Sequence, residues 1–263
     1  GLRTYDKYSP YPEEMNRRLT GAIADLHFSP TVANKQNLLK ENVDEKNIFI
    51  TGNTVIDALK STVKENYKFK DEYLNSVDFD AKKVILMTAH RRENLGKPLE
   101  NICSAVKEIV EKHSDVEVVY PVHLNPAVRE TANKILGGMD RVHLIEPLDV
   151  VDMHNAMHRC YMVMTDSGGL QEEAPSLGKP VIVLRTETER PEAVKAGTVI
   201  MGGIEKDVIV KYASDLICDS EFYKKISKTA NPYGDGTASK RTVDAILYHF
   251  GYLKERPEDL KVD

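Results

Sequence analysis

The chain has few cysteines and no long apolar run, and these two absences limit the classes of protein to which it can belong. Its 263 residues include three cysteines, an odd number with no Cys-x-x-Cys pair, so the sequence indicates neither a disulfide framework nor a zinc knuckle. We expect Cys103, Cys160 and Cys218 to be small buried side chains. No apolar stretch approaches the roughly 20 residues that cross a bilayer, and the opening GLRTYDKYSP contains no signal-peptide core. We therefore expect a cytoplasmic protein with no membrane partner.

An excess of positive charge is also lacking. Lys and Arg number 36 and Asp and Glu number 41, which gives a formal net charge of −5. Proteins dedicated to nucleic acids concentrate Lys and Arg to neutralise phosphates, so we expect no nucleic-acid partner. With 41% hydrophobic and 29% charged residues, the chain can bury a core beneath a solvated surface, which excludes a disordered chain.

Strand-like runs alternate with helix-like stretches along most of the chain, which is typical of a parallel α/β sheet. The clearest strands are expected at residues 47–51, 83–88, 116–121, 142–145, 161–165 and 180–184. Helical periodicity is seen at residues 101–112, 126–135 and 152–157. We therefore predict an α/β fold in which residues 81–235 form one complete Rossmann-like domain.

The flanking segments look different. Residues 13–24 and 29–41 are expected to be helices with a short strand at 24–28 between them, which resembles the end of a preceding α/β domain. The predicted organisation is a remainder of an N-terminal Rossmann-like domain (1–66), a charged linker (67–80), the complete domain (81–235), and a C-terminal helix and tail that pack back on the N-terminal part (236–263). Because the chain opens on Gly1 within turn-like sequence, we expect a fragment.

The strongest local signal is TDSGGLQEE, residues 165–173, after an apolar strand. Gly168 and Gly169 at the start of a helix leave backbone N–H groups exposed at the carboxyl edge of the sheet, where a diphosphate would bind. Glu173 follows one turn later, and its two oxygens suit the two hydroxyls of a ribose. The alternative is a tight turn that needs glycine only for packing.

Histidine and arginine follow three other expected strands. His90 and Arg91 lie in TAHRREN, His123 lies in PVHLNP, and Arg190 lies in RTETERPE. Such side chains at the carboxyl edge of a sheet can donate to phosphate oxygens. The alternative is a set of exposed ion pairs, which contribute little.

Two further patterns are weaker. Glu13 and Arg17, four residues apart on an expected helix, share one face and could supply an acid/base carboxylate and a cation. The spacing alone favours the alternative, a solvated helix with stabilising ion pairs. His154 and His158 also lie four residues apart, but no third ligand accompanies them, so we expect no metal.

Taken together, the segments resemble the non-hydrolysing UDP-N-acetylglucosamine 2-epimerases. The resemblance covers nearly the whole chain in the family's order and is carried by YSPYPEEMNRRLTGAIADLHFSPT, TGNTVIDAL, TAHRREN, PVHLNP, EPLDVVDMHNAM, TDSGGLQEEAPSLGKPVIVLRTETERPE and PYGDGTAS. It implies a glycosyltransferase-B-like fold with one complete Rossmann-like domain and the C-terminal part of a preceding one.

The resemblance also implies a reaction, the interconversion of UDP-GlcNAc and UDP-ManNAc. The C2 proton is removed as UDP departs, a 2-acetamidoglucal intermediate forms, and UDP adds back after C2 is protonated from the opposite face. This path needs acid/base groups and cations, and we expect no cofactor. The family's N-terminal phosphate loop is absent from this sequence, so the resemblance implies weak UDP binding and little turnover for this chain alone.

Residue roles follow from the same resemblance. The implied catalytic residues are Glu13, Arg17 and His90; the implied UDP contacts are His90, Leu148, Met153, Ser167, Gly168, Gly169, Glu173 and Arg190. Leu148 and Met153 fall beside the base, where the family often carries an aromatic in place of Met153. Arg91 and His123 match residues that contact a second UDP-GlcNAc, an allosteric activator in bacterial members. The family is usually a homodimer.

Three other functions share these features. A hydrolysing 2-epimerase would release UDP and free ManNAc from a similar site. A glycosyltransferase of the same fold would need an acceptor site that the segments do not indicate. A non-catalytic UDP-sugar-binding module would need only the nucleotide contacts.

Overall fold

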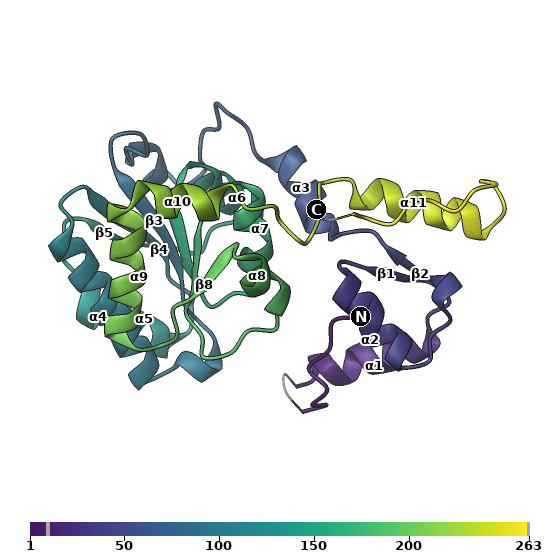
Figure 1. The fold of residues 1–263 in the computed structure, drawn as a ribbon. Coiled ribbons are helices and arrows are strands. Elements are labelled where there is room, and N and C mark those ends of the chain that lie inside the picture. The colour runs from purple at the N-terminus through teal and green to yellow at the C-terminus, as the bar shows by residue number, and fades with distance from the viewer. Residues whose placement is uncertain (9–10, 262–263) are drawn as a thin grey trace. The chain divides into compact units, whose positions relative to one another are not determined.

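The protein is described here by a computed structural model, which defines residues 1–8 and 11–261 (Figure 1). The chain divides into two compact units. Unit 1 comprises Gly1–Ser61 and Ala230–Asp263, and unit 2 comprises Thr62–Thr229. Within the described residues no helix is both long and apolar enough to cross a membrane.

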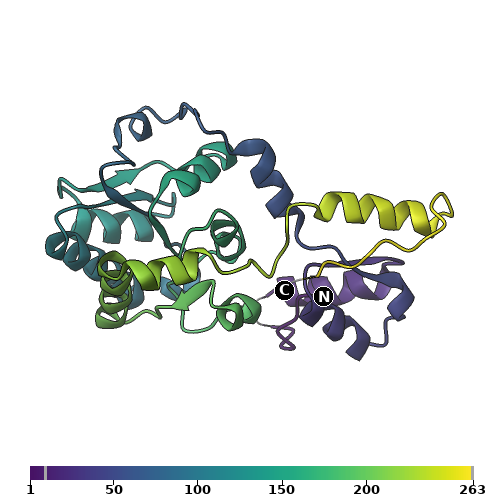
Figure 2. The same cartoon turned by 45° about the horizontal axis from the view of Figure 1, so that its top comes forward.

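Unit 2 is built on a parallel sheet of six strands in the order β5-β4-β3-β6-β7-β8. The strands are β3 (Lys83–Thr88), β4 (Val116–Pro121), β5 (Val142–Ile145), β6 (Met162–Thr165), β7 (Val181–Val183) and β8 (Val199–Met201). The helices are η2 (Leu74–Ser76), η3 (Arg92–Asn94), α4 (Lys97–Lys112), α5 (Pro126–Leu136), α6 (Val150–Arg159), α7 (Leu170–Ser176), α8 (Pro191–Ala196), α9 (Lys206–Cys218) and α10 (Ser220–Ser227). Helices cover both sides of the sheet (Figures 1 and 2). The strand order reverses between β3 and β6, which is the switch point of a doubly wound fold.

The core of unit 2 explains why its strands are continuously apolar. Five of the six residues of β3 are buried, because helices lie on both faces of a parallel sheet. On α4 the residues at helical spacing are fully buried, among them Ile102, Val106 and Ile109. This apolar stripe lies in the core, while α4 also contacts α5 and α9. Each such side chain contributes about 1.5–3 kcal/mol when it leaves water.

Unit 1 contains a parallel pair of strands, β1 (His27–Ser29) and β2 (Ile48–Ile50). Its helices are α1 (Glu13–Ile23), α2 (Val32–Lys40), η1 (Glu45–Asn47), α3 (Thr54–Thr62), whose last residue already belongs to unit 2, and α11 (Ala238–His249). The C-terminal tail covers β2: the Ile50 N–H donates to Asp259 Oδ1 at 2.8 Å, and the Leu260 N–H donates to the Ile50 carbonyl at 2.7 Å. Residues 256–260 therefore satisfy polar groups at one edge of the pair.

The segments TGNTVIDAL and PYGDGTAS meet within unit 1. Asp57 on α3 accepts hydrogen bonds from the Ala238 and Ser239 N–H groups at 3.0 and 2.8 Å, and so caps the first turn of α11. Gly52 has φ +84°, and a Cβ there would lie 3.2 Å from the Gly234 Cα. Glycine is required at position 52 by both its backbone conformation and this close approach.

The predicted fold class is confirmed, since unit 2 has a six-stranded parallel sheet with helices on both faces and unit 1 has a parallel pair of strands. The observed division falls after Ser61 and before Ala230, compared with the expected boundaries at 66 and 235. Strand β8 and helices α9 and α10 were not among the elements predicted from the sequence. Cys218 is exposed at the end of α9, so its predicted burial is wrong. Burial of the other two cysteines is confirmed, and it raises the pKa of Cys103 and Cys160 to about 12.

The charged segment at 67–80, expected to be a linker, packs on unit 2. Its anchor is Asp152 of α6, which is 3% exposed. The Asp152 carboxylate accepts hydrogen bonds from the Tyr67 hydroxyl at 2.7 Å and from the Lys70 and Asp71 N–H groups at 3.0–3.1 Å. The sequence pattern missed this arrangement because a buried carboxylate distant in sequence satisfies the backbone of an aperiodic segment.

Asp152→Asn tests that anchor. We expect the free energy of unfolding to fall by roughly 2 kcal/mol, because hydrogen bonds to an ionised group are worth about 1.5–3 kcal/mol each. Urea denaturation followed by circular dichroism measures the change. Asp80→Asn, at an exposed position in the same segment, is the matched control. Equal denaturation midpoints for the two variants would contradict the anchoring role.

Candidate functional site

The candidate site in unit 2 forms where β3 and β6 end side by side. Thr88 and Thr165 are register partners, and their hydroxyl oxygens lie 2.6 Å apart. The Thr165 hydroxyl also accepts the Ser167 N–H at 2.9 Å. The loops after both strands therefore start from one fixed point at the carboxyl edge of the sheet, where ligands bind in doubly wound folds.

Asp166 joins these two loops. Its side chain is fully buried, and its Oδ2 atom accepts hydrogen bonds from the His90 N–H at 2.8 Å, the Arg91 N–H at 2.8 Å and the Asn94 amide at 3.0 Å. The Asn94 amide donates in addition to the Leu184 carbonyl at 3.0 Å, at the end of β7. One carboxylate thus holds the loop after β3 against the loop after β6.

The His90 side chain is accessible, with 40% of its surface exposed. Its Nδ1 atom lies 3.7 Å from Asp166 Oδ1. Its ring stacks on that of His123, with centroids 5.2 Å apart and planes 7° apart. His123 is itself held, since its Nδ1 accepts the Asn125 N–H at 3.0 Å. The structure therefore brings together the two histidines that the sequence placed after separate strands.

Three arginines surround the carboxylate of Glu189. Arg91 Nη1 lies 3.4 Å from Glu189 Oε1, Arg185 Nη1 lies 3.7 Å from the same oxygen, and Arg190 Nη1 lies 3.7 Å from Oε2. Arg190 Nε also forms an ion pair with Glu172. Within the described residues the buried Nη1 atoms of Arg185 and Arg190 make no hydrogen bond. These two Nη1 atoms lie close to the Glu189 carboxylate without donating a hydrogen bond to it.

Neither Gly168 nor Gly169 has a positive φ, so the backbone conformation does not require glycine at either position. A Cβ on Gly169 would lie 3.1 Å from Glu173 Oε1, which is closer than ordinary contacts. A Cβ on Gly168 would lie 3.5 Å from Arg190 Nη2 and 3.7 Å from Arg91 Nη2. The absence of a side chain at Gly169 therefore leaves room for the Glu173 carboxylate, whereas a Cβ on Gly168 would make ordinary contacts with the two guanidinium groups.

Glu173 is positioned by a buried histidine that the sequence did not single out for this role. His154 on α6 is 4% exposed, and its Nε2 lies 3.4 Å from Glu173 Oε2. The other ring nitrogen, Nδ1, lies 2.7 Å from the Thr62 hydroxyl. Leu148 and Met153, predicted to lie beside a base, are half-buried just before and within α6.

No metal site accompanies these side chains in the described part of the chain, where no group of three His, Cys, Asp or Glu residues has the geometry to hold an ion. His154, one of the pair considered from the sequence, has both ring nitrogens occupied by Thr62 and Glu173.

Glu13 and Arg17 lie on α1 in unit 1, whereas all the other predicted site residues lie in unit 2. Glu13 is exposed and Glu14 is fully buried. The Glu14 carboxylate accepts the Thr4 and Tyr5 N–H groups at 3.2 and 3.1 Å and pairs with Arg17 at 3.5 Å and with Arg18 at 3.4 Å. The Glu14 carboxylate thus holds residues 4 and 5 against α1, while Glu13 is exposed to solvent.

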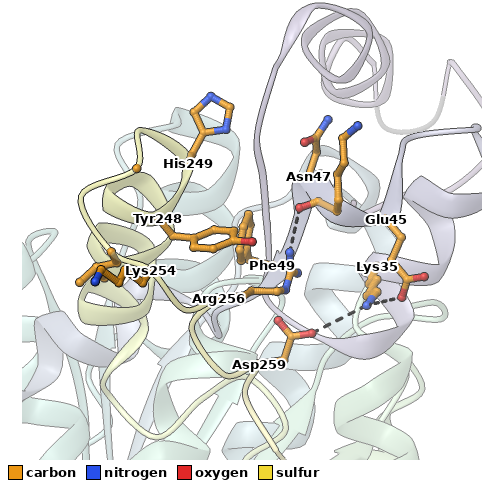
Figure 3. Close-up of a pocket in the computed structure, with 12 residues that line it drawn as sticks. Lys35, Glu45, Asn47, Phe49, Tyr248, His249, Lys254, Arg256 and Asp259 are labelled. Atoms are coloured by element: carbon orange, nitrogen blue, oxygen red, sulfur yellow. Dashed lines mark hydrogen bonds and ion pairs between the residues drawn. The ribbon is translucent and has the colours of Figure 1, made fainter.

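A separate cavity of about 860 Å³ lies in unit 1, between the start of β2 and the chain after α11 (Figure 3). No predicted site residue lines it. Two of the cations that line it have partners. Lys35 pairs with Glu45 at 2.8 Å and Asp259 at 3.7 Å. The Arg256 guanidinium donates to the Lys46 and Ile48 carbonyls, and its Cζ lies 4.0 Å from the centroid of the Phe49 ring. These contacts attach the C-terminal tail to β2.

Sequence reasoning missed several residues that shape the site in unit 2. They are Asp166, Glu172, Arg185, Glu189, and His154 in its contact with Glu173. A usable signal existed for Asp166, because it directly follows the strand predicted at 161–165 and so had to lie at the carboxyl edge of the sheet. The spacing of His154 from His158 does not indicate its contact with Glu173, which lies in a later segment of the chain.

Comparison with known proteins gives a consistent result. A family described as UDP-N-acetylglucosamine 2-epimerase matches residues 1–247. The Bacillus subtilis UDP-N-acetylglucosamine 2-epimerase is 58% identical over 258 residues, which is 98% of this chain and 67% of the relative. The Escherichia coli K12 enzyme of the same name is 51% identical over 251 residues, with 94% and 67% covered. This chain thus spans about two thirds of the length of these relatives.

Solved structures agree. The Staphylococcus aureus MnaA–UDP co-structure matches with TM-score 0.94 and 52% identity, covering 99% of this chain and 70% of that one. The Neisseria meningitidis UDP-GlcNAc 2-epimerase bound to UDP-GlcNAc matches with TM-score 0.87 and 46% identity, covering 94% and 68%. With a family match over 247 of its residues and the glycosyltransferase-B-like fold of its neighbours, the chain belongs to the UDP-N-acetylglucosamine 2-epimerase family.

Proposed function

We propose that this protein is a non-hydrolysing epimerase that interconverts UDP-GlcNAc and UDP-ManNAc. The observation that carries the proposal is the convergence of His90, Arg190, Glu173 and the Ser167–Gly169 turn (167–169) at the switch point of unit 2. That edge of the sheet is where a doubly wound fold receives a nucleotide. Family membership supports the reaction class, and the UDP and UDP-GlcNAc held by two similar structures support the ligand class.

In this proposal UDP lies across the carboxyl edge of β3 and β6. The diphosphate contacts the backbone of Ser167, Gly168 and Gly169, with Arg190 and His90 as donors. The unsaturated Nη1 of Arg190 supports this role, because a dianionic group can accept the hydrogen bonds that Glu189 leaves unmade. Leu148 and Met153 form the apolar wall beside the uracil, with the Met153 thioether adapting to its shape.

The carboxylate of Glu173 accepts hydrogen bonds from both ribose hydroxyls. Its position favours this role, since it is half-buried, one of its oxygens faces Gly169, and the other is held by His154. A buried partner that fixes a carboxylate reduces the entropy lost when a ligand binds.

The acid/base carboxylate is assigned to Glu13, with Arg17 as a neighbouring cation. Glu13 is the better candidate of the adjacent pair, because the four groups that contact Glu14 commit its carboxylate to the fold. Removal of the C2 proton is coupled to departure of UDP, which gives 2-acetamidoglucal; protonation from the opposite face and re-addition of UDP complete the cycle. No electron is gained or lost, so the path requires no redox cofactor.

Arg91 and His123 are proposed to contact a second UDP-GlcNAc that acts as an activator. His123 stacks on His90 and Arg91 contacts Glu189 beside Arg190, so both residues adjoin the proposed UDP contacts. The family resemblance also supports a cytoplasmic homodimer and low turnover for this chain on its own.

Two other enzymes and a binding module remain as alternatives with distinct products. A hydrolysing epimerase releases free ManNAc, so product analysis for UDP-ManNAc separates it from the proposed reaction. A glycosyltransferase would transfer labelled sugar to an acceptor. A non-catalytic module would bind UDP or UDP-GlcNAc, but it would not exchange the C2 proton of the sugar with solvent, even when joined to the N-terminal segment of a relative.

Glu173→Gln tests the ribose contact. We expect UDP binding to weaken about tenfold, because a charge-assisted hydrogen bond is worth roughly 1.5–3 kcal/mol and 1.4 kcal/mol is tenfold. Binding of 2′,3′-dideoxy-UDP should not change, since it lacks the hydroxyls. Titration calorimetry measures both affinities. Glu187→Gln, at an exposed position, is the control, and an equal loss for both ligands would reject the assignment.

Glu13→Gln tests the acid/base role in a protein that joins this chain to the N-terminal segment of the Bacillus subtilis relative. We expect exchange of the C2 proton with solvent to fall by about 10²–10⁴-fold, the usual contribution of general acid/base catalysis, while UDP binding is retained. Proton NMR in D₂O follows the exchange. Asp25→Asn, an exposed carboxylate just after α1, should exchange normally. Exchange at the unsubstituted rate in Glu13→Gln would reject the role.

A further inference from the structure

Asp166 is the most completely buried acidic group at the candidate site, and one of its oxygens has an unusual environment. Oδ2 accepts three N–H donors at 2.8–3.0 Å, which is the arrangement of an ionised carboxylate. Oδ1 is buried and accepts no hydrogen bond from the described residues. Buried acceptors normally accept a hydrogen bond, so a buried oxygen without one at a candidate site is expected to have a nearby donor.

The nearest ring nitrogen to this orphan oxygen is Nδ1 of His90, at 3.7 Å. The same carboxylate also holds the His90 backbone N–H at 2.8 Å. One group therefore contacts both the main chain and the ring of His90, and the ring is restrained a second time by its stacking on His123. Since Nδ1 faces Asp166, the opposite edge of the imidazole carries Nε2, and the side chain is 40% exposed.

We propose that Asp166 is a positioning residue that sets the tautomer and direction of the His90 imidazole. An acceptor-only oxygen beside Nδ1 favours a proton on Nδ1, and this leaves the Nε2 lone pair directed toward the accessible side of the ring. Long contacts of this kind in ligand-free sites shorten when the ligand closes the site. The catalytic consequence rests on the proposed function. Nε2 is presented in a fixed direction to take up a proton from solvent, and the resulting imidazolium, which Asp166 stabilises at Nδ1, donates from Nε2 to the oxygens of the departing diphosphate.

The register of the sheet explains why this arrangement is built into the fold. Thr88 and Thr165 are paired, so Asp166 begins the next loop directly beside residues 89–91. The Ala89 carbonyl is fixed from the other side by the hydroxyl of Tyr120, a fully buried residue, at 2.7 Å. His90 therefore has little freedom to choose another orientation.

Asp166→Asn provides the test, because the amide is nearly isosteric. Its oxygen can replace Oδ2 toward the backbone donors, which places the NH₂ group beside His90 Nδ1. A donor at that place favours a proton on Nε2. Long-range ¹H–¹⁵N spectra of ¹⁵N-histidine-labelled protein, with the neutral imidazole, report the protonated nitrogen directly, and His90→Gln identifies the His90 signals.

We expect the Nδ1-protonated tautomer in the unsubstituted chain and the Nε2-protonated tautomer in Asp166→Asn. Asn94→Ala is the matched control, because it removes one partner of Oδ2 and leaves Oδ1 in place; the tautomer should stay on Nδ1. An Nε2-protonated majority in the unsubstituted chain, or an unchanged tautomer in Asp166→Asn, would overturn the proposal. If Asp166→Asn fails to fold, the spectrum of the unsubstituted chain still decides.

A double-mutant cycle on UDP affinity separates positioning from general structural support. Asp166→Asn should weaken UDP binding in the unsubstituted background and change it little in the His90→Gln background. Equal losses in both backgrounds would show that Asp166 does not act through His90. If the chain binds no UDP at all, the proposed function fails, whereas the tautomer measurement still tests Asp166 independently.

Discussion

The parallel pairing of β3 with β6 is the constraint on which the site in unit 2 depends. Thr88 and Thr165 end their strands in register, and their hydroxyl contact at 2.6 Å ties the two strand ends together. From this point one loop carries His90 and the other carries Asp166 and the glycine turn. A register slip of one residue would direct each side chain to the opposite face, so the sheet core and the site are specified by the same pairing.

Charge at the site is organised by carboxylates as much as by arginines. Glu172 holds Arg190 at Nε, and Glu189 lies at 3.4–3.7 Å from three guanidinium groups without satisfying all their donors. This arrangement holds cations close together, which would otherwise repel, and still leaves donors for a larger anion. It also explains how a chain with net charge −5 can gather cationic donors at the proposed diphosphate site: the local field depends on which groups are buried and how they are paired.

Much of this could be predicted from the sequence, and what could not has a common physical cause. Strands β3, β4 and β5 were predicted at their observed bounds, because buried parallel strands are continuous apolar runs. The place of His90 and of the turn at 167–169 at the carboxyl edge of the sheet was predicted because both follow such strands. The short strand β8 and the packed segment at 67–80 were missed, since their stability comes from partners distant in sequence. The same applies to the contact of His154 with Glu173, which no local spacing encodes.

The two units of the chain hold different parts of the proposed chemistry. All the groups assigned to UDP lie in unit 2, and their supports, Asp166, Glu172 and His154, lie there too. The proposed nucleotide contacts and the groups that hold them therefore belong to the same unit. Glu13, the proposed acid/base group, belongs to the other. Helix α3 connects them through the chain, and its last residue, Thr62, contacts the histidine that holds Glu173. One buried side chain, His154, therefore links the end of α3 to Glu173, the carboxylate proposed to bind the ribose.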